Sequence, residues 1–230
     1  MILMPTCDRP ELLGKALASV RRYTNYPVLV LDEGDGEDTR SLAHHYRCQY
    51  LCTKKDKGRW RIPGYAYNIA VKRLECENIF LTCGDIYHVD DCINPMLKAL
   101  ARDPKAMVIT QGKDDVRGDF LQSLDPRPWH TMRRLDTTMH FLLGLKRMEF
   151  TAIGGYDEDL TGSHYDDNDF VERLQKNGCH YVMTDARIIH LFHPRPRSHA
   201  LRRINRRVYW DKKDGPIVRN ANREWGVAYA

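Results

Sequence analysis

The chain of 230 residues is long enough for one domain with an appendage, and its 42% hydrophobic residues can form a sizeable buried core. This composition excludes an intrinsically disordered chain, and the longest apolar runs are too short for a transmembrane segment. Seven cysteines without a C-x-x-C pair, and an N-terminus unlike a signal peptide, indicate free thiols and a cytoplasmic protein.

The formal net charge of +5 is distributed unevenly along the chain. Residues 195–230 carry ten Lys or Arg and three acidic residues, a net charge of +7, which leaves −2 for the remainder. A basic segment suits an anionic partner such as nucleic acid, a phosphorylated substrate or a membrane surface. It is equally typical of a solvated, arginine-rich helix, so both interpretations stay open.

Apolar runs and helical periodicities alternate along the first 110 residues, which predicts an α/β fold with a mostly parallel sheet flanked by helices. The chain has neither a G-x-G-x-x-G nor a Walker motif, which argues against a dinucleotide or P-loop site. The expected strands cover residues 2–4, 28–31, 50–51, 79–81 and 107–109. Four helices are expected. The first begins at Pro10, the second passes through Ala43, the third covers residues 63–74 and the fourth begins at Asn94.

The second half contains an irregular segment, an acidic helix and a final strand. We expect Gly112–Thr138 to form a long loop that acts as a substrate-binding lid. An apolar stripe through Leu174 predicts a helix that Gly178 ends. Further apolar residues from Cys179 onward predict strands that lead to His190.

Two expected strands are followed by acids, Asp32 after Leu31 and Asp85 shortly after Leu81. In a parallel sheet the carboxyl ends of strands lie at one rim, where ligands bind. We therefore expect the two carboxylates to share that rim.

Three acids, Asp166, Asp167 and Asp169, occupy the first turn of the acidic helix. Acids at this position complement the helix dipole, which is a sufficient structural reason for one or two of them. Three of them repel one another and raise the pKa of at least one, and a carboxylate with a raised pKa is suited to act as a general base.

Two histidines, His190 and His193, lie near the end of the last expected strand. Residues three apart on an extended strand face opposite sides, so we expect only one of them to bind a given metal ion. One histidine together with Asp85 would suit Mn²⁺ or a similar divalent ion.

The ordered set of motifs over residues 1–195 resembles the family 2 glycosyltransferases of the GT-A fold. The set is much more specific than any one of its members. It consists of Pro5–Leu13, Val30–Gly34, Asn68, Leu81–Asp85, Gly154–Glu158, Asp166–Asp169 and His190.

The resemblance implies a binding site for a nucleotide-sugar. Thr6 and Arg9 match the loop that borders the nucleotide, Asp32 the acid that holds the uracil or ribose, and Asn68 an asparagine under the donor. Cys83 replaces the first acid of the family's D-x-D motif, which puts the ribose contacts, the donor preference and the metal affinity in doubt.

The resemblance also implies the metal ligands and the base. Asp85 and His190 match the ligands of a divalent ion, Mn²⁺ or Mg²⁺, with His193 as a second candidate. Asp167 matches the catalytic base, preceded by Asp166 in place of the family's glutamate. Arg195 or Arg197 would clamp the donor diphosphate.

The expected organisation is a catalytic domain at 1–195, with a nucleotide-binding half at 1–110 and an acceptor half at 111–195, followed by a basic helical extension at 196–230. The expected activity is metal-dependent, inverting transfer from a UDP-sugar to an acceptor hydroxyl. The acceptor is a saccharide, a lipid-linked saccharide or a hydroxymethylated base in phage DNA, held through residues 195–223.

Basic and aromatic residues in the loop and the extension favour a large anionic acceptor, because proteins grip nucleic acid with this combination. A non-enzymatic nucleic-acid-binding module is one alternative, and it leaves the aspartates unexplained. A sugar nucleotidyltransferase is another, and it would need more basic residues near the N-terminus than Arg9. The residues in question are Trp129, Arg202, Arg203, Arg206, Arg207, Tyr209, Trp210 and Trp225.

Overall fold

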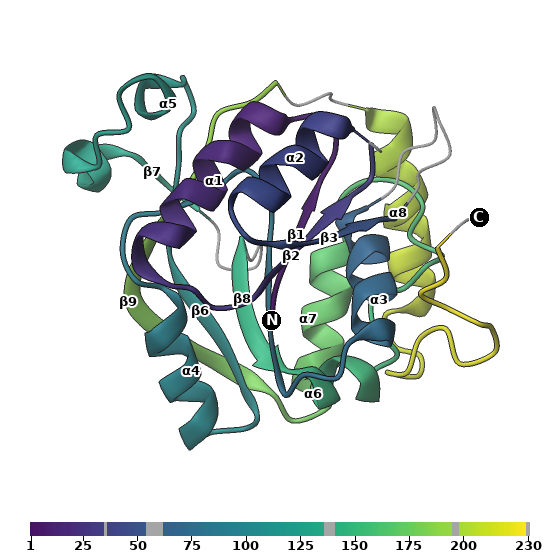
Figure 1. Ribbon diagram of the computed structural model, residues 1–230. Coiled ribbons are helices and arrows are strands. Elements are labelled where there is room, and N and C mark those ends of the chain that lie inside the picture. Colours follow the sequence, from purple (N-terminus) through teal and green to yellow (C-terminus); the bar gives the residue numbers. More distant parts are fainter. Residues whose placement is uncertain (35, 54–61, 136–140, 195–197, 229–230) are drawn as a thin grey trace.

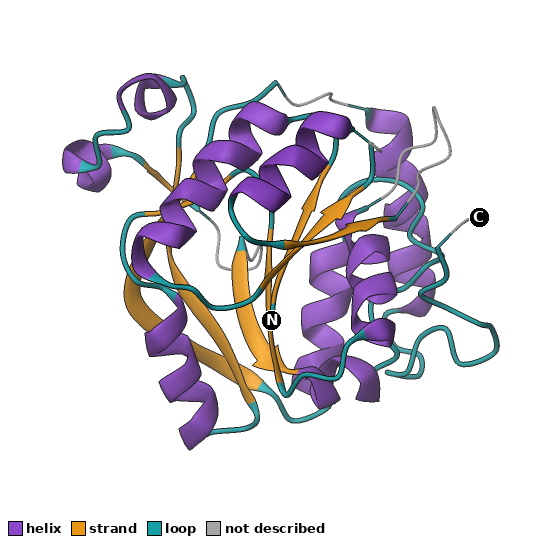
Figure 2. Cartoon of the chain, viewed as in Figure 1, coloured by secondary structure: helices purple, strands orange, loops and turns teal. Residues whose placement is uncertain are grey.

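A computed structural model describes residues 1–34, 36–53, 62–135, 141–194 and 198–228 (Figure 1). In this part of the chain, nine strands form a single sheet between two layers of helices (Figure 2). None of the described helices combines the length and the apolar character that a bilayer crossing requires. All seven cysteines lie in described residues, and none of them forms a disulfide there.

The first half alternates strands and helices as expected from the sequence. Its elements are β1 (Ile2–Thr6), α1 (Pro10–Tyr23), β2 (Val28–Asp32), α2 (Glu37–His45), β3 (Gln49–Cys52), α3 (Pro63–Arg73), β4 (Asn78–Thr82), β5 (Ile86–His88) and α4 (Ile93–Arg102).

The second half is less regular. Its elements are β6 (Ala106–Asp114), α5 (Asp119–Ser123), the 3₁₀ helix η1 (Arg127–Thr131), β7 (Arg133–Arg134), β8 (Leu142–Lys146), α6 (Arg147–Ala152), α7 (Asp166–Lys176), β9 (His180–His190) and α8 (His199–Lys212).

The strands follow the order β3-β2-β1-β4-β8-β6-β9-β5, and β7 pairs with β6. The first four strands are parallel, as expected. The expectation of a mostly parallel sheet is confirmed only in part, because the whole sheet is mixed. β9 runs parallel to β6, but β8 runs antiparallel to β4 and β6, and β5 antiparallel to β9. The continuous apolar run of β8 is typical of a strand buried on both faces and says nothing about its direction.

Alternate residues of the central strands pack into two separate cores. Met4 and Val30 point to the core under α1, α2 and α4, whereas Leu3 and Leu31 point to the core under α3, α6 and α7 (Figure 1). Each fully buried aliphatic side chain of this kind stabilises the fold by about 1.5–3 kcal/mol. The two cores hold the strands rigidly, so the residues at the strand ends keep fixed positions.

The segment from Gly112 to Thr138 is expected from the sequence to be an irregular loop. Up to residue 135, where the described part ends, it instead contains regular secondary structure. β6 continues to Asp114, and α5, η1 and β7 follow. Trp129 is buried against Phe120 and others in a third, smaller core. The expected boundary between residues 110 and 111 therefore falls within β6.

The C-terminal segment forms the expected helix, α8, which packs beside α7 (Figure 1). The chain then returns to the body of the protein, where Arg219 and Asn220 are buried and the Gly226 amide donates to Glu158. Residues 198–228 are thus packed against the rest of the described chain through both α8 and the loop that follows it.

Candidate functional site

The carboxyl ends of β1, β2 and β4 meet at one rim of the sheet. Thr6 pairs with Asp32 across β1 and β2, and an added Cβ at Gly84 would lie 3.1 Å from the side chain of Thr6. This tight spacing favours glycine, and the hydrogen bond from the Gly84 amide to the Pro5 carbonyl brings Asp85 next to the end of β1. The predicted convergence of Asp32 and Asp85 on one rim is therefore correct.

Asp32 is fully buried, and both of its carboxylate oxygens accept hydrogen bonds within the protein. The Gly34 and Gly36 amides donate at 2.8 and 3.0 Å, and the Tyr50 hydroxyl donates at 2.9 Å. Asp32 thus shapes the loop after β2. Its predicted contact with the nucleotide stays a prediction.

Asp85 lies at the centre of a compact polar cluster. Its Oδ2 is 3.2 Å from His193 Nε2, 3.7 Å from His190 Nε2 and 3.3 Å from the guanidinium of Arg9. One ligand atom from each of Asp85, His190 and His193 lies within 4.8 Å of the others. The cluster could therefore bind a divalent ion through one carboxylate and two imidazoles.

The expectation that only one of the two histidines faces this site is wrong. β9 ends at His190, which pairs with Ile86 of β5, and the chain then leaves the extended conformation. The turn brings His193 back to Asp85, and the two imidazole rings are 5.2 Å apart at their centres. The alternation rule applies only within a strand, and the strand ends between the two residues.

A second layer of residues orients His190. Its Nδ1 lies 2.9 Å from Asp114 Oδ1, and Asp114 also pairs with Arg133. A carboxylate behind a histidine fixes the ring tautomer and orientation, and this pattern is common at metal sites. The sequence analysis missed Asp114, although it too is an acid at the end of a strand.

The electrostatics of Asp85 suit a cation. Burial alone would raise its pKa, but hydrogen bonds and charge interactions with His190 and His193 outweigh burial and hold the pKa well below the usual value. Among the described residues, none donates a hydrogen bond to the buried Asp85 Oδ1. An ionised carboxylate with a free, buried oxygen beside two imidazoles fits a borderline ion such as Mn²⁺.

A pair of partly buried acids, Asp166 and Asp167, begins α7. Burial raises the pKa of both, and the neighbouring Asp167 charge raises that of Asp166 further. The Tyr156 hydroxyl donates to Asp167 Oδ1 at 3.4 Å and partly offsets the rise in its pKa. A carboxylate whose pKa is closer to neutrality is a better general base.

Asp169 has a structural role instead. It is buried, and its carboxylate pairs with Arg173 at 2.7 Å and with Arg219 at 3.1 Å. Of the three acids in the first turn, the two that precede it are therefore the candidates for chemistry.

Side chains connect the Asp167 region to the strand rim. Tyr156 lies beside Tyr67, with ring centres 5.7 Å apart, and the Tyr67 hydroxyl is 3.9 Å from Cys83 Sγ. Burial raises the pKa of the Cys83 thiol, and the nearby Asp85 and Asp167 charges raise it further. Cys83 is therefore a neutral thiol between the two candidate sites.

Asn68 supports the loop that carries Tyr156. Its amide donates to the Tyr156 carbonyl and to Glu158, and it accepts a hydrogen bond from the Tyr156 amide at 2.9 Å. A Cβ at Gly155, which has a φ of +68°, would lie 2.4 Å from the Asn68 oxygen. Asn68 thus positions the loop, and its predicted donor contact stays a prediction. Arg195 and Arg197 lie outside the described residues.

A cavity of about 650 Å³ opens beside the Asp85 cluster, and a neighbouring cavity of about 460 Å³ shares two of its residues. The first is lined by Asp114, Asp115, Val116, Arg133, His164, Phe192, His193, Pro194, Ser198, His199 and Arg202. The second is lined by Tyr165, His199, Arg202, Arg203 and Arg206. Both cavities lie where α8 faces the residues before α7.

The chain matches the model of the family "Glycosyl transferase family 2" over residues 1–164. The match includes Asp32 and Asp85 and ends before the acidic pair and the two histidines. No curated protein sequence matches the chain.

Three solved structures show a similar fold. A mannosyltransferase from Pyrobaculum calidifontis, in complex with GDP-Man and Mn²⁺, has a TM-score of 0.57 and 18% identity, and the match covers 84% of this chain and 57% of that one. S. aureus TarS has a TM-score of 0.60 and 15% identity over 84% of this chain and 36% of its own. GalNAc-T7 with UDP, GalNAc and Mn²⁺ has a TM-score of 0.64 and 14% identity, and the match covers 92% of this chain and 48% of that one. The chain thus spans between 36% and 57% of these proteins.

Proposed function

Because the chain belongs to glycosyl transferase family 2, we propose that it transfers a sugar from a nucleoside diphosphate sugar to an acceptor hydroxyl, with Asp167 as general base. The observation that carries the proposal is that two carboxylates near the same rim of the sheet have pKa values shifted in opposite directions. Asp85 is held ionised beside two histidines, whereas Asp167 has a raised pKa. Enzymes separate their acidic and basic roles in this way.

The ligands of the metal ion are Asp85, His190 and His193, and the ion is Mn²⁺ or Mg²⁺. When bound, the ion neutralises the charge that develops on the leaving diphosphate. Arg9, 3.3 Å from Asp85, is placed to add a positive charge beside the same diphosphate.

In the proposed reaction the acceptor oxygen attacks the anomeric carbon while Asp167 accepts the hydroxyl proton. The bond between the anomeric carbon and the diphosphate oxygen breaks, and the nucleoside diphosphate leaves with the electron pair. A single direct displacement of this kind inverts the anomeric configuration. It needs only one ionised carboxylate near the acceptor, which fits a pair in which burial and the Asp167 charge raise the pKa of Asp166 above that of Asp167.

The proposed donor is a UDP-sugar, as the resemblance of the motif at Asp32 implies. The proposed acceptor is a saccharide, a lipid-linked saccharide or a hydroxymethylated base in DNA. Two of the structural neighbours support the donor class, since one was solved with GDP-Man and the other with UDP, each with Mn²⁺.

Hydrolysis of the donor without acceptor tests the proposal. The purified protein with Mn²⁺ is offered UDP-glucose, UDP-galactose, UDP-N-acetylglucosamine, UDP-N-acetylgalactosamine and GDP-mannose, and release of free sugar is measured. We expect slow hydrolysis of one or two donors, complete dependence on the metal, and loss of activity in Asp85→Asn.

Asp90→Asn is the matched control, because Asp90 is also a paired acid but its partner is Arg187, away from the histidines. This variant should hydrolyse the donor as the wild type does. If no donor of the panel is bound or hydrolysed, the proposed function is wrong.

A further inference from the structure

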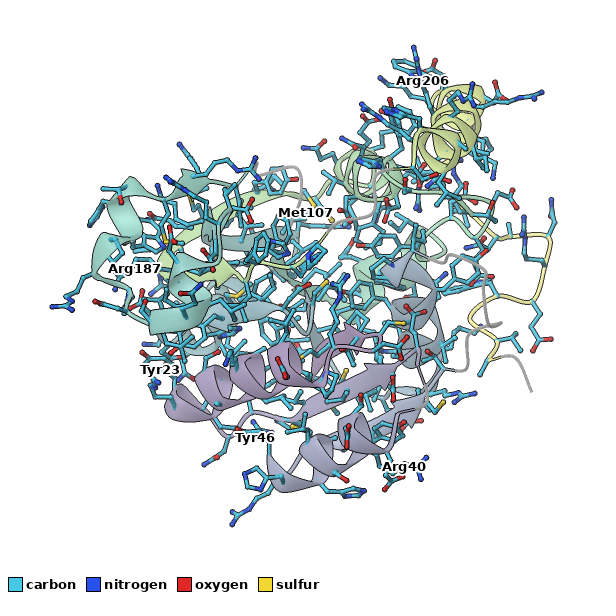
Figure 3. All side chains as sticks on the ribbon, turned by 90° about the horizontal axis from the view of Figure 1, so that it is seen from above. Tyr23, Arg40, Tyr46, Met107, Arg187 and Arg206 are labelled. Atoms are coloured by element: carbon cyan, nitrogen blue, oxygen red, sulfur yellow. The ribbon has the colours of Figure 1, made fainter. Side chains whose placement is uncertain are left out.

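The two cavities beside α8 form one basic cleft, defined by His199, Arg202, Arg203 and Arg206. His199 and Arg202 line both cavities, so the cavities adjoin at these two residues of α8. Arg206 lies at the outer surface of α8, away from the sheet (Figure 3). The arginines span about one helical turn, roughly 6 Å along the axis.

The arginines of the basic cleft have no internal counter-charge. Within residues 198–228 and the other described ranges, no carboxylate pairs with the side chains of Arg202, Arg203 or Arg206. Arg207, on the same helix, differs because Asp211 lies 3.7 Å from it and it lines neither cavity. A row of unpaired guanidinium groups along a cavity favours a ligand with repeated negative charges.

The two acids of the larger cavity do not cancel this charge. Asp114 is already paired with Arg133 and His190. The carboxylate of Asp115 accepts hydrogen bonds from three backbone amides at the start of α5, those of residues 118, 120 and 121. The charge that remains available in the basic cleft is therefore positive.

The larger cavity, which Arg202 lines, also has two exposed apolar residues in its wall. Phe192 is 39% exposed and Val116 is 52% exposed, although both are large hydrophobic residues. One side of the Phe192 ring rests on Gly118, where an added Cβ would be 3.4 Å away. An exposed aromatic ring that shares a cavity with an unpaired arginine, Arg202, is the combination that holds a base and its phosphate.

The basic cleft also leads to the proposed base. His164 lines the larger cavity and Tyr165 the smaller, and these two residues immediately precede Asp166 and Asp167. At its other end the larger cavity reaches the proposed metal ligand His193. A chain lying in the cleft would therefore pass beside both parts of the proposed reaction centre.

We infer that the basic cleft binds a single nucleic-acid strand, with phosphates on Arg202, Arg203 and Arg206 and a base on Phe192, and that this strand carries the acceptor hydroxyl. The inference rests on the proposed function and selects the acceptor class. A neutral saccharide would leave the arginines unpaired.

Salt-dependent binding of a fluorescein-labelled, mixed-sequence single-stranded oligonucleotide tests the inference by anisotropy, in EDTA and again with Mn²⁺. Three phosphate contacts on a single strand predict a log–log slope of about −2, which weakens binding about 20-fold between 50 and 200 mM salt. Each of Arg202→Ala, Arg203→Ala and Arg206→Ala should reduce the slope by about 0.7.

Arg207→Ala is the matched control, because it removes the same charge from the same helix outside the basic cleft. It should leave affinity and slope unchanged. Phe192→Leu should weaken oligonucleotide binding by about threefold or more and leave the affinity for inorganic polyphosphate unchanged, because polyphosphate has no base to stack.

Three results would overturn the inference. They are no oligonucleotide binding by the wild type at 50 mM salt, an equal loss in Arg207→Ala and Arg202→Ala, or equal competition by heparin together with no effect of Phe192→Leu. The last result would identify a site for sulfated or phosphorylated polysaccharide. Donor hydrolysis by the wild type separates the two proposals: hydrolysis without oligonucleotide binding would overturn only the inferred acceptor, whereas no hydrolysis of any donor would overturn the proposed function.

Discussion

Asp85 and Asp167 show how differently two carboxyl groups behave in one site. Asp85 is buried, yet two histidines and Arg9 keep its charge favourable. Among the described residues Asp167 has no cationic neighbour of this kind, so burial raises its pKa and the hydrogen bond from the Tyr156 hydroxyl opposes the change. Environment therefore assigns cation binding to the first and proton transfer to the second.

Asp167→Asn should retain donor and metal binding and lose transfer. The amide keeps the size and most contacts of the side chain but cannot accept the acceptor proton, so we expect kcat to fall by about 10² to 10⁴-fold with little change in KM for the donor. Steady-state kinetics with the identified donor would check this. Asn168→Ala, an exposed change on the same turn, is the control, and near wild-type turnover by Asp167→Asn would refute the assignment.

Tyr156→Phe should move the acidic limb of the pH–rate profile to higher pH. Transfer needs the ionised form of Asp167, so the rate falls as pH drops through its pKa. The Tyr156 hydroxyl stabilises that ionised form, and its loss raises the pKa. The ring itself should stay in place, because it stacks on Phe170 with centres 4.1 Å apart. An unchanged kcat/KM profile between pH 5 and 9 would show that Asp167 does not control the rate.

At the scale of elements, the sequence predicts the nucleotide-binding half better than the acceptor half. Strands β1 to β4 are short apolar runs separated by helical periodicity, and these local patterns survive in the structure. The direction and the length of a strand depend on tertiary contacts. The antiparallel insertion of β8 and the extension of β6 to Asp114 depend on pairing partners distant in the sequence.

The same limit explains which site residues were found and which were missed. Asp32 and Asp85 follow runs that end where the strands end, whereas Asp114 follows Gly112 and Lys113, which look like a loop. The pairing of Gly112 with Ile188 on β9 makes that stretch a strand. Sequence alone likewise could not show that the chain turns between His190 and His193.

Arg219 connects the C-terminal loop to α7, and its replacement should destabilise the fold. Arg219→Ala removes one partner from each of the buried acids Asp157 and Asp169, at 3.3 and 3.1 Å. Each acid keeps another cation, so we expect a loss of about 2 kcal/mol in the free energy of unfolding, below the cost of a fully orphaned buried charge. Urea unfolding followed by circular dichroism would measure it.

Arg223→Ala is the matched control for this experiment. Arg223 lies in the same C-terminal loop as Arg219 and pairs with Asp159, but both side chains are substantially exposed. The loss of this pair should therefore lower the free energy of unfolding by less than about 1 kcal/mol. Equal effects of the two variants would mean that the C-terminal loop does not depend on the buried network around α7.

At the scale of the whole molecule, the near-neutral body and the basic segment supply different parts of the proposed site. The near-neutral body supplies Asp85 and Asp167 at the sheet rim. The basic segment supplies α8, which packs against α7 and carries three arginines that pair with no carboxylate of the described residues. Because α7 also carries the proposed base, an anionic acceptor held by α8 would have a fixed position relative to Asp167.

Because the residues of the rim and α8 belong to one packed fold, ligands that bind at the rim should stabilise the entire fold. Mn²⁺ and nucleoside diphosphate, each at about 100 times its Kd, should together add at least about 2.7 kcal/mol and raise the Tm by about 5–10 °C. Thermal unfolding with UDP or GDP, each with and without EDTA, would measure this and would show which nucleotide is preferred. Asp85→Asn and His193→Ala should abolish the metal-dependent part, whereas His180→Ala, an exposed histidine paired with Asp103, should retain it. An equal shift in EDTA would show that the nucleotide binds without the Asp85 cluster.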